Sequence, residues 1–114
     1  MKILIIDDEK DILDMLGEFL RLFDAEVDIA FSGNEGVRKI KQKNYDAVIT
    51  DVKMEDGDGM YVLDQINSLG VSIGKIIVMT GYSQYKPEAF LDKGAYKVLQ
   101  KPLDTSDLRI FLGL

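Results

Sequence analysis

The sequence contains no cysteine and no histidine, and each absence excludes a class of chemistry. Without cysteine the chain has no disulfide, no thiol nucleophile and no cysteine-based zinc site. Without histidine it has no Ser-His-Asp triad, is not a phosphohistidine carrier, and lacks the side chain that usually transfers protons near neutral pH. Its chemistry must therefore rest on carboxylates, lysine, hydroxyl groups or a bound metal ion.

Long apolar runs and an excess of basic residues are also missing. No apolar run approaches the roughly 18 residues that a membrane span needs. The short apolar run near the N-terminus ends in acids, which is not typical of a signal peptide. We therefore expect a cytoplasmic protein with no membrane contact. The net charge of −6 argues against direct nucleic-acid binding by this domain, because phosphate contacts need a basic surface.

What is present favours a single α/β domain. A length of 114 residues and a hydrophobic content of 46% suit one globular domain. Apolar segments typical of buried strands cover residues 2–7, 26–30, 47–51, 75–80 and 96–100. Helical patterns follow each of them, with start and stop signals at Ser32, Asp58, Gly70, Pro87, Gly94 and Asp104. This alternation predicts a flavodoxin-like, doubly wound, five-stranded parallel sheet of order 2-1-3-4-5 with five helices.

Polar side chains stand where the predicted strands end. Asp7 and Asp8 follow the first strand, Asp51 ends the third, Thr80 ends the fourth and Lys101 follows the fifth. Parallel strands bring these ends to one edge of the sheet, where open α/β folds bind ligands. For Asp51 alone, a polar residue that simply closes a strand is an equally good interpretation. The five side chains together are better explained by a functional site.

The charges of this set indicate a metal and a phosphoryl group. Carboxylates about 4 Å apart repel by roughly 4 kcal/mol per pair at an effective dielectric near 20, so three of them need cations nearby. Lys101 supplies one positive charge, and an all-oxygen ligand set selects Mg²⁺ or Mn²⁺ rather than zinc. An aspartate carboxylate can accept a phosphoryl group as an acyl phosphate. The metal, Lys101 and the Thr80 hydroxyl would stabilise its oxygens.

These residues, in this order, resemble the receiver domain of two-component response regulators. The matching segments are IDDE around Asp7 and Asp8, DVKMEDGDG after Asp51, MTG at Thr80, and GAYKVLQKP from Gly94 to Pro102. The resemblance covers essentially the whole chain, residues 1–114. It implies a signalling domain that catalyses only its own phosphorylation and dephosphorylation.

The resemblance also assigns roles to single residues. It implies that Asp51 is the phosphoacceptor and that Asp7 and Asp8 bind the metal with Asp51. The backbone carbonyl of Lys53 would be a further metal ligand. Thr80 would follow the phosphoryl group and Lys101 would bind it, with a cis peptide bond before Pro102.

The partners that the resemblance implies are a sensor histidine kinase and an output domain, fused or separate. Phosphorylation would change the surface of the fourth helix, fifth strand and fifth helix, and Tyr82 and Tyr85 are candidate parts of it. For either tyrosine alone, packing at the edge of the core is an equally good interpretation. A phosphorylation-linked homodimer is left open. The chain is compatible with a stand-alone regulator and with an N-terminal domain excised from a longer one.

Three positions depart from the family pattern. Val98 stands where the family usually has an aromatic switch residue, and we expect Tyr96 to share its face. Either Tyr96 covers part of the switch role or the switch works without a ring, and we favour reduced aromatic gating. Gly81 follows Thr80 where alanine is common, which predicts an acyl phosphate that is more open to water. Glu55 replaces a frequent proline, so the loop loses a conformational restraint.

Two other functions remain as alternatives. An aspartate-nucleophile phosphohydrolase would need a second acid two residues after Asp51, but Lys53 stands there. A degenerate receiver that serves only as a scaffold would not need the complete set of acids, threonine and lysine. Turnover of a simple phosphate ester would favour the first.

Overall fold

The computed structural model describes residues 1–81 and 84–114. The parallel strands are β1 (Lys2–Ile6), β2 (Glu26–Ala30), β3 (Ala47–Asp51), β4 (Lys75–Thr80) and β5 (Lys97–Gln100), in the order β2-β1-β3-β4-β5. The helices are α1 (Lys10–Arg21), α2 (Gly33–Gln42), α3 (Gly59–Leu69), α4 (Pro87–Leu91) and α5 (Thr105–Leu112). The predicted fold is confirmed. The first strand ends one residue earlier than predicted, and the fifth begins one residue later.

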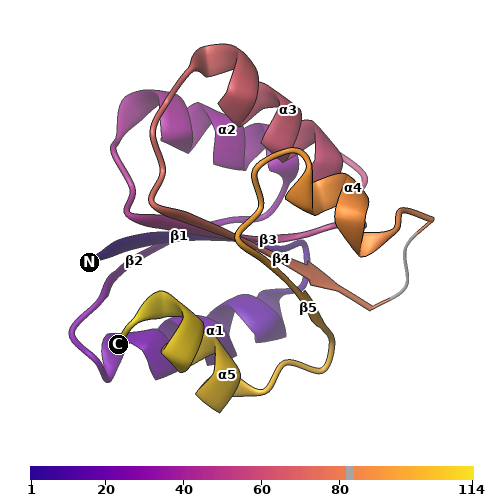
Figure 1. Cartoon of the computed structure of the whole chain (residues 1–114). Helices are drawn as coiled ribbons and strands as arrows, with labels where there is room; N and C mark the ends of the chain where they lie inside the picture. The colour runs from indigo at the N-terminus through magenta and orange to yellow at the C-terminus, as the bar shows by residue number, and fades with distance from the viewer. Residues whose placement is uncertain (82–83) are drawn as a thin grey trace.

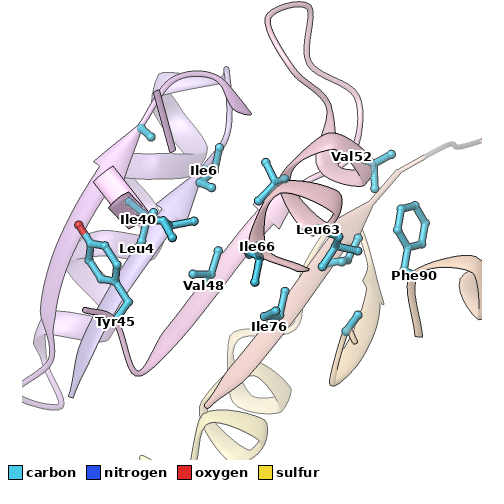
Figure 2. Packing of buried hydrophobic residues seen from close by; sticks show 14 of the residues in the cluster. Leu4, Ile6, Ile40, Tyr45, Val48, Val52, Leu63, Ile66, Ile76 and Phe90 are labelled. Atoms are coloured by element: carbon cyan, nitrogen blue, oxygen red, sulfur yellow. The ribbon is translucent and has the colours of Figure 1, made fainter. Parts of the chain in front are cut away.

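Helices cover both faces of the sheet. Figure 1 shows α2, α3 and α4 on one face and α1 and α5 on the other. Consecutive strand residues face opposite sides, so β1 sends Leu4 and Ile6 to the first face and Ile3 and Ile5 to the second. All four side chains are completely buried, and each contributes about 1.5–3 kcal/mol of burial free energy. Figure 2 shows the first of these two cores.

The helix ends fix where the loops begin. The Ser32 hydroxyl accepts a hydrogen bond from the Glu35 backbone N–H at 3.1 Å, as the predicted capping box requires. The Glu35 carboxylate accepts from Phe31, one residue before the expected partner. Asp58 caps α3 by accepting from Tyr61 at 2.8 Å, and Gly70 ends that helix with φ 66°. Ser32 and Asp58 thus begin their helices at the carboxyl edge of the sheet, beside the loops that follow β2 and β3.

The described residues contain no helix that is both long and apolar enough to cross a membrane.

Candidate functional site

The structure brings three carboxylates together at the carboxyl edge of the sheet. Asp7, Asp8 and Asp51 each offer an oxygen, and these oxygens lie within 4.8 Å of one another. Asp7 follows β1 and is completely buried, whereas Asp51 ends β3 with 6% of its surface exposed. Asp8 is exposed. The cluster therefore has a buried base and an open mouth.

Lys101 reaches this cluster from the end of β5. Its ammonium lies 2.9 Å from Asp7 Oδ2 and 3.2 Å from Asp51 Oδ2. The Lys101-Pro102 peptide bond is cis, as the resemblance implied. One ammonium is thus shared by two carboxylates, and Lys101 is mostly buried. The three acids and the lysine leave two negative charges, which one divalent cation would neutralise.

The surroundings shift the pKa values of Asp51 and Lys101. Burial raises the pKa of Asp51 to about 6, and the negative charge of Asp7 acts in the same direction. The charge and hydrogen bond of Lys101 and the N–H of Val52 oppose this rise. Burial alone would lower the pKa of Lys101, but its hydrogen bond to Asp7 and the Asp51 charge outweigh burial and raise it. Lys101 therefore stays cationic, and Asp51 is mostly ionised only above about pH 6.

Backbone groups hold the two buried acids in place. The Val52 N–H donates to Asp51 Oδ1 at 2.9 Å, and the Glu9 N–H donates to Asp7 Oδ1 at 2.9 Å. The chain then folds back beside Asp51, where a Cβ at Gly59 would lie only 2.6 Å from the Asp51 carbonyl oxygen. A residue larger than glycine at position 59 would displace this backbone, and with it the strand end that carries the acid.

Two hollows adjoin the cluster. The first has a volume of about 200 Å³ and is lined by Glu9, Asp51, Val52, Lys53, Gly81 and Lys101. The second has a volume of about 530 Å³ and is lined by Asp8, Glu9, Lys53, Met54 and Glu55. Lys53 lines both, and a metal-ligand role for its backbone carbonyl stays a prediction. Glu55 adds an acid to the rim of the second hollow.

A third hollow lies beside the end of β4. It has a volume of about 210 Å³ and is lined by Thr80, Gly81, Tyr85, Pro87, Phe90, Val98 and Gln100. The Tyr85 ring packs edge-on against the Phe90 ring, with centroids 5.5 Å apart. Val98 contributes no ring to this hollow, and the tyrosine ring beside Thr80 is that of Tyr85. No periodic pattern predicts this placement, because Tyr85 belongs to a loop. Tyr82 lies outside the described residues.

Tyr96 does not share the face of Val98. Its ring lies 5.1 Å from the ammonium of Lys75, which donates to the Phe111 carbonyl oxygen of α5. Val98 instead packs against the core beneath α2, α3 and α4. The expected shared face is not observed. The Tyr96 N–H still donates to the Ile76 carbonyl oxygen of β4 at 2.7 Å, but the chain bends at residue 96 and regular strand alternation begins at Lys97. The switch role of either residue stays a prediction.

The site can hold a hard cation and a phosphoryl group. The described residues gather carboxylate oxygens from Asp7, Asp8 and Asp51 without sulfur or imidazole, which suits Mg²⁺ or Mn²⁺. The first hollow places open space beside Asp51, Lys101 and Gly81, and Thr80 lines the third hollow. A carboxylate and an ammonium are therefore in contact at this edge, and the hydroxyl of Thr80 belongs to the neighbouring hollow, which shares Gly81 with the first.

Comparisons with known proteins agree with this geometry. Transcriptional regulatory protein ZraR of Salmonella typhimurium is 33% identical over 108 residues, which cover 94% of this chain and 24% of ZraR. Transcriptional regulatory protein DltR of Streptococcus agalactiae is 32% identical over 109 residues, which cover 95% of this chain and 48% of DltR. The chain thus spans about a quarter to a half of the length of these curated relatives.

Solved structures and the family's sequence model give the same result. A response regulator receiver domain protein from Clostridium thermocellum has a TM-score of 0.89 and 34% identity, covering 98% of this chain and 90% of that one. A CheY-like receiver domain protein from Methanospirillum hungatei JF-1 has a TM-score of 0.89, 31% identity and the same coverage. The sequence model of the response regulator receiver domain matches residues 3–112. Since that match spans nearly the whole fold and includes every strand end described above, the chain belongs to the receiver domain family of two-component response regulators.

Proposed function

We propose that this receiver domain is switched by phosphorylation of Asp51, with a sensor histidine kinase as the donor. The observation that carries the proposal is the Lys101 ammonium, which contacts both Asp51 and the buried Asp7 at the mouth of the acidic cluster. A cation in that place is suited to bind the oxygens of a phosphoryl group attached to Asp51.

The transfer itself exchanges one bond for another. A carboxylate oxygen of Asp51 attacks the phosphorus of the kinase's phosphohistidine, so that a P–O bond forms and the P–N bond breaks. The imidazole leaves with the electron pair of the broken bond. Attack requires the ionised carboxylate, and a pKa of about 6 leaves Asp51 mostly ionised at neutral pH.

A metal ion fits the same site. Asp7, Asp8, Asp51 and the backbone carbonyl of Lys53 would hold Mg²⁺ or Mn²⁺, which neutralises charge on the phosphoryl oxygens when it is bound. Lys101 binds the phosphoryl group from the β5 side, and its raised pKa keeps it protonated. The chain's own residues thus orient the group and stabilise its charge.

Phosphorylation would be reported through Thr80. Its hydroxyl donates to a phosphoryl oxygen, and the movement reaches the third hollow, which Tyr85 and Val98 both line. The surface of α4, β5 and α5 then shifts between two states that the phosphoryl group biases. Hydrolysis ends the signal, when water attacks the phosphorus, releases phosphate and restores the Asp51 carboxylate.

The output is proposed from the relatives. ZraR and DltR are transcriptional regulatory proteins that are longer than this chain. We therefore assign to this receiver the control of an output domain that acts in transcription, in the same chain or in a separate one. The phosphohydrolase alternative gains no support, because Lys53 stands where such an enzyme would need its second acid.

The test is to incubate the protein with acetyl phosphate, with and without Mg²⁺, and to measure intact mass. We expect the mass of one phosphoryl group to be added to the wild type only with Mg²⁺, and not to Asp51→Asn. Asp92→Asn is the control, because it removes an exposed acid just after α4. Equal phosphorylation of Asp51→Asn and wild type would overturn the proposal.

A further inference from the structure

The loop between β3 and α3 (residues 52–58) is fastened to the first turn of α2. The Gly33 N–H donates to the Gly57 carbonyl oxygen at 3.0 Å, and the Asn34 N–H donates to the Asp56 carbonyl oxygen at 3.0 Å. The Asn34 side-chain amide also donates to Asp56 Oδ1 at 2.6 Å. Three hydrogen bonds thus join two segments that lie more than twenty residues apart in the sequence.

The contact is close enough to require glycine. A Cβ at Gly33 would lie 2.2 Å from the Gly57 carbonyl oxygen, so no side chain fits there. Gly57 has φ +87°, a left-handed conformation that favours glycine. The two backbones therefore touch directly, and α2 and the loop behave as one packed unit.

Helix physics explains why the loop docks at this end of α2. The first N–H groups of a helix have no partner within the helix, and they form the positive end of its dipole. Ser32 satisfies the N–H of Glu35. The Asp56 and Gly57 carbonyl oxygens accept hydrogen bonds from the N–H groups of Asn34 and Gly33. The loop and the first turn of α2 therefore stabilise each other.

The same loop begins at the acidic cluster. It leaves directly after Asp51 and carries Lys53, and its two ends are joined by the Gly59 N–H, which donates to the Val52 carbonyl oxygen at 2.8 Å. The loop has Glu55 where the family often has proline, so no proline ring restrains its backbone. The outer half of the loop is instead restrained from outside, by Asn34 and Gly33.

We propose that Asn34 is a positioning residue for the metal site, which acts by holding Asp56 and thereby the segment that carries Lys53. This proposal rests on the proposed function, because it assumes that the Asp cluster binds Mg²⁺. Asn34 contacts neither the cluster nor the hollows described above. Its effect on metal affinity must therefore pass through Asp56 and the loop.

The decisive variant is Asn34→Asp, because two mechanisms predict opposite results. If only the summed charge mattered, a new carboxylate would strengthen Mg²⁺ binding. If Asn34 positions the loop, the new carboxylate repels Asp56, opens the contact and weakens Mg²⁺ binding. We expect the Kd for Mg²⁺, from amide NMR shifts during Mg²⁺ titration, to rise by roughly threefold to tenfold.

An exchanged pair supplies the rescue. In the double variant Asn34→Asp with Asp56→Asn, the amide and the carboxylate change places and the net charge is that of the wild type. The hydrogen bond can re-form, so the Kd should return to within about twofold of wild type. Asn67→Ala is the matched control, since it removes a hydrogen bond of 2.9 Å from a side-chain amide to the Lys93 carbonyl oxygen, away from the loop. It should leave the Kd unchanged.

The outcomes separate the two proposals. If wild type binds Mg²⁺ and Asn34→Asp binds it equally or more tightly, the positioning role is wrong and the proposed function stands. The positioning role is also wrong if the exchanged pair stays as weak as Asn34→Asp. If wild type shows no Mg²⁺-dependent shifts around Asp51, the metal-dependent function fails first. A melting temperature for each variant verifies that the protein is folded during the titration.

Discussion

Lys101 donates a hydrogen bond of 2.9 Å to Asp7, a residue 94 positions earlier whose side chain has no exposed surface. Asp7 follows β1 and Lys101 follows β5, and β3 and β4 lie between these strands in the sheet. This hydrogen bond therefore joins the two sides of the site, across the ends of β3 and β4. It also gives the buried carboxylate its cation, so that the stability of the domain and the chemistry of the site depend on the same pair.

The first prediction concerns Lys101→Met. This change leaves Asp7 buried without its ammonium, and loss of one partner of a buried pair costs about 3–5 kcal/mol. We expect that loss in the free energy of unfolding by urea in EDTA, and a partial recovery when Mg²⁺ is added. Lys93→Met is the control, because it breaks an exposed pair with Asp64 and should cost less than about 1 kcal/mol. Equal losses for the two variants would contradict the prediction.

The second prediction concerns pH and Asp51→Asn in metal-free buffer. The Asp51 carboxyl keeps its proton up to about pH 6 in the folded protein, whereas in the unfolded chain it loses it near 3.8. Between these values the folded state binds more protons, so this group's contribution to stability falls as pH rises through that window. The asparagine side chain cannot ionise, so the Asp51→Asn variant does not lose this stability as the pH rises. The stability of Asp51→Asn relative to wild type should increase by about 2–3 kcal/mol from about pH 4 to about pH 7.5.

Urea denaturation at several pH values measures this difference. Asp46→Asn removes an exposed carboxylate and is the control for a general charge effect. A difference between Asp51→Asn and wild type that stays constant with pH would show that Asp51 titrates alike in the folded and unfolded states.

The sequence was sufficient for the sheet and for the strand-end residues, because short continuous apolar runs and capping residues are local signals. Asp51 could be identified as a candidate because a strand buried on both faces ends there in an acid. The contacts of the loop that follows Asp51 were harder to predict. The contact of Asn34 with Asp56 depends on how α2 docks beside α3, and no local pattern encodes it.

The place of Tyr96 was harder still. Its predicted face assumed that strand alternation continued to residue 96, but the strand begins at Lys97. The chain bends at Tyr96, and the ring lies beside the ammonium groups of Lys75 and Lys97. Tyr85 reached the hollow beside Thr80 for a related reason, since a loop of its length imposes no periodicity.

The third prediction separates these two tyrosines. Tyr96→Ala should leave the rate of phosphorylation by acetyl phosphate unchanged while it weakens binding of the phosphorylated domain to its partner, because Tyr96 is 45% exposed and lies away from Thr80. It should cost about 0.5–1 kcal/mol of stability through the lost contact with Lys75. Tyr85→Ala, by contrast, should alter the beryllofluoride-induced NMR shift of Thr80. Equal partner binding by the Tyr96→Ala and wild-type phosphoforms would rule out the first expectation.

The fourth prediction concerns Gly81→Ala and the lifetime of the acyl phosphate. Gly81 lines the hollow beside Asp51, and the nearest atom to an added Cβ is the Lys101 Cβ at 4.0 Å, so alanine fits without strain. The extra methyl group narrows the path by which water reaches the phosphorus. Dephosphorylation should therefore slow several-fold, while stability rises by about 0.4–1 kcal/mol because the unfolded chain loses freedom. Phosphate release after removal of acetyl phosphate measures the rate, with Gly70→Ala, at a left-handed helix end far from Asp51, as the control for glycine replacement. An unchanged rate in Gly81→Ala would mean that water reaches the phosphoryl group by a route that does not pass residue 81.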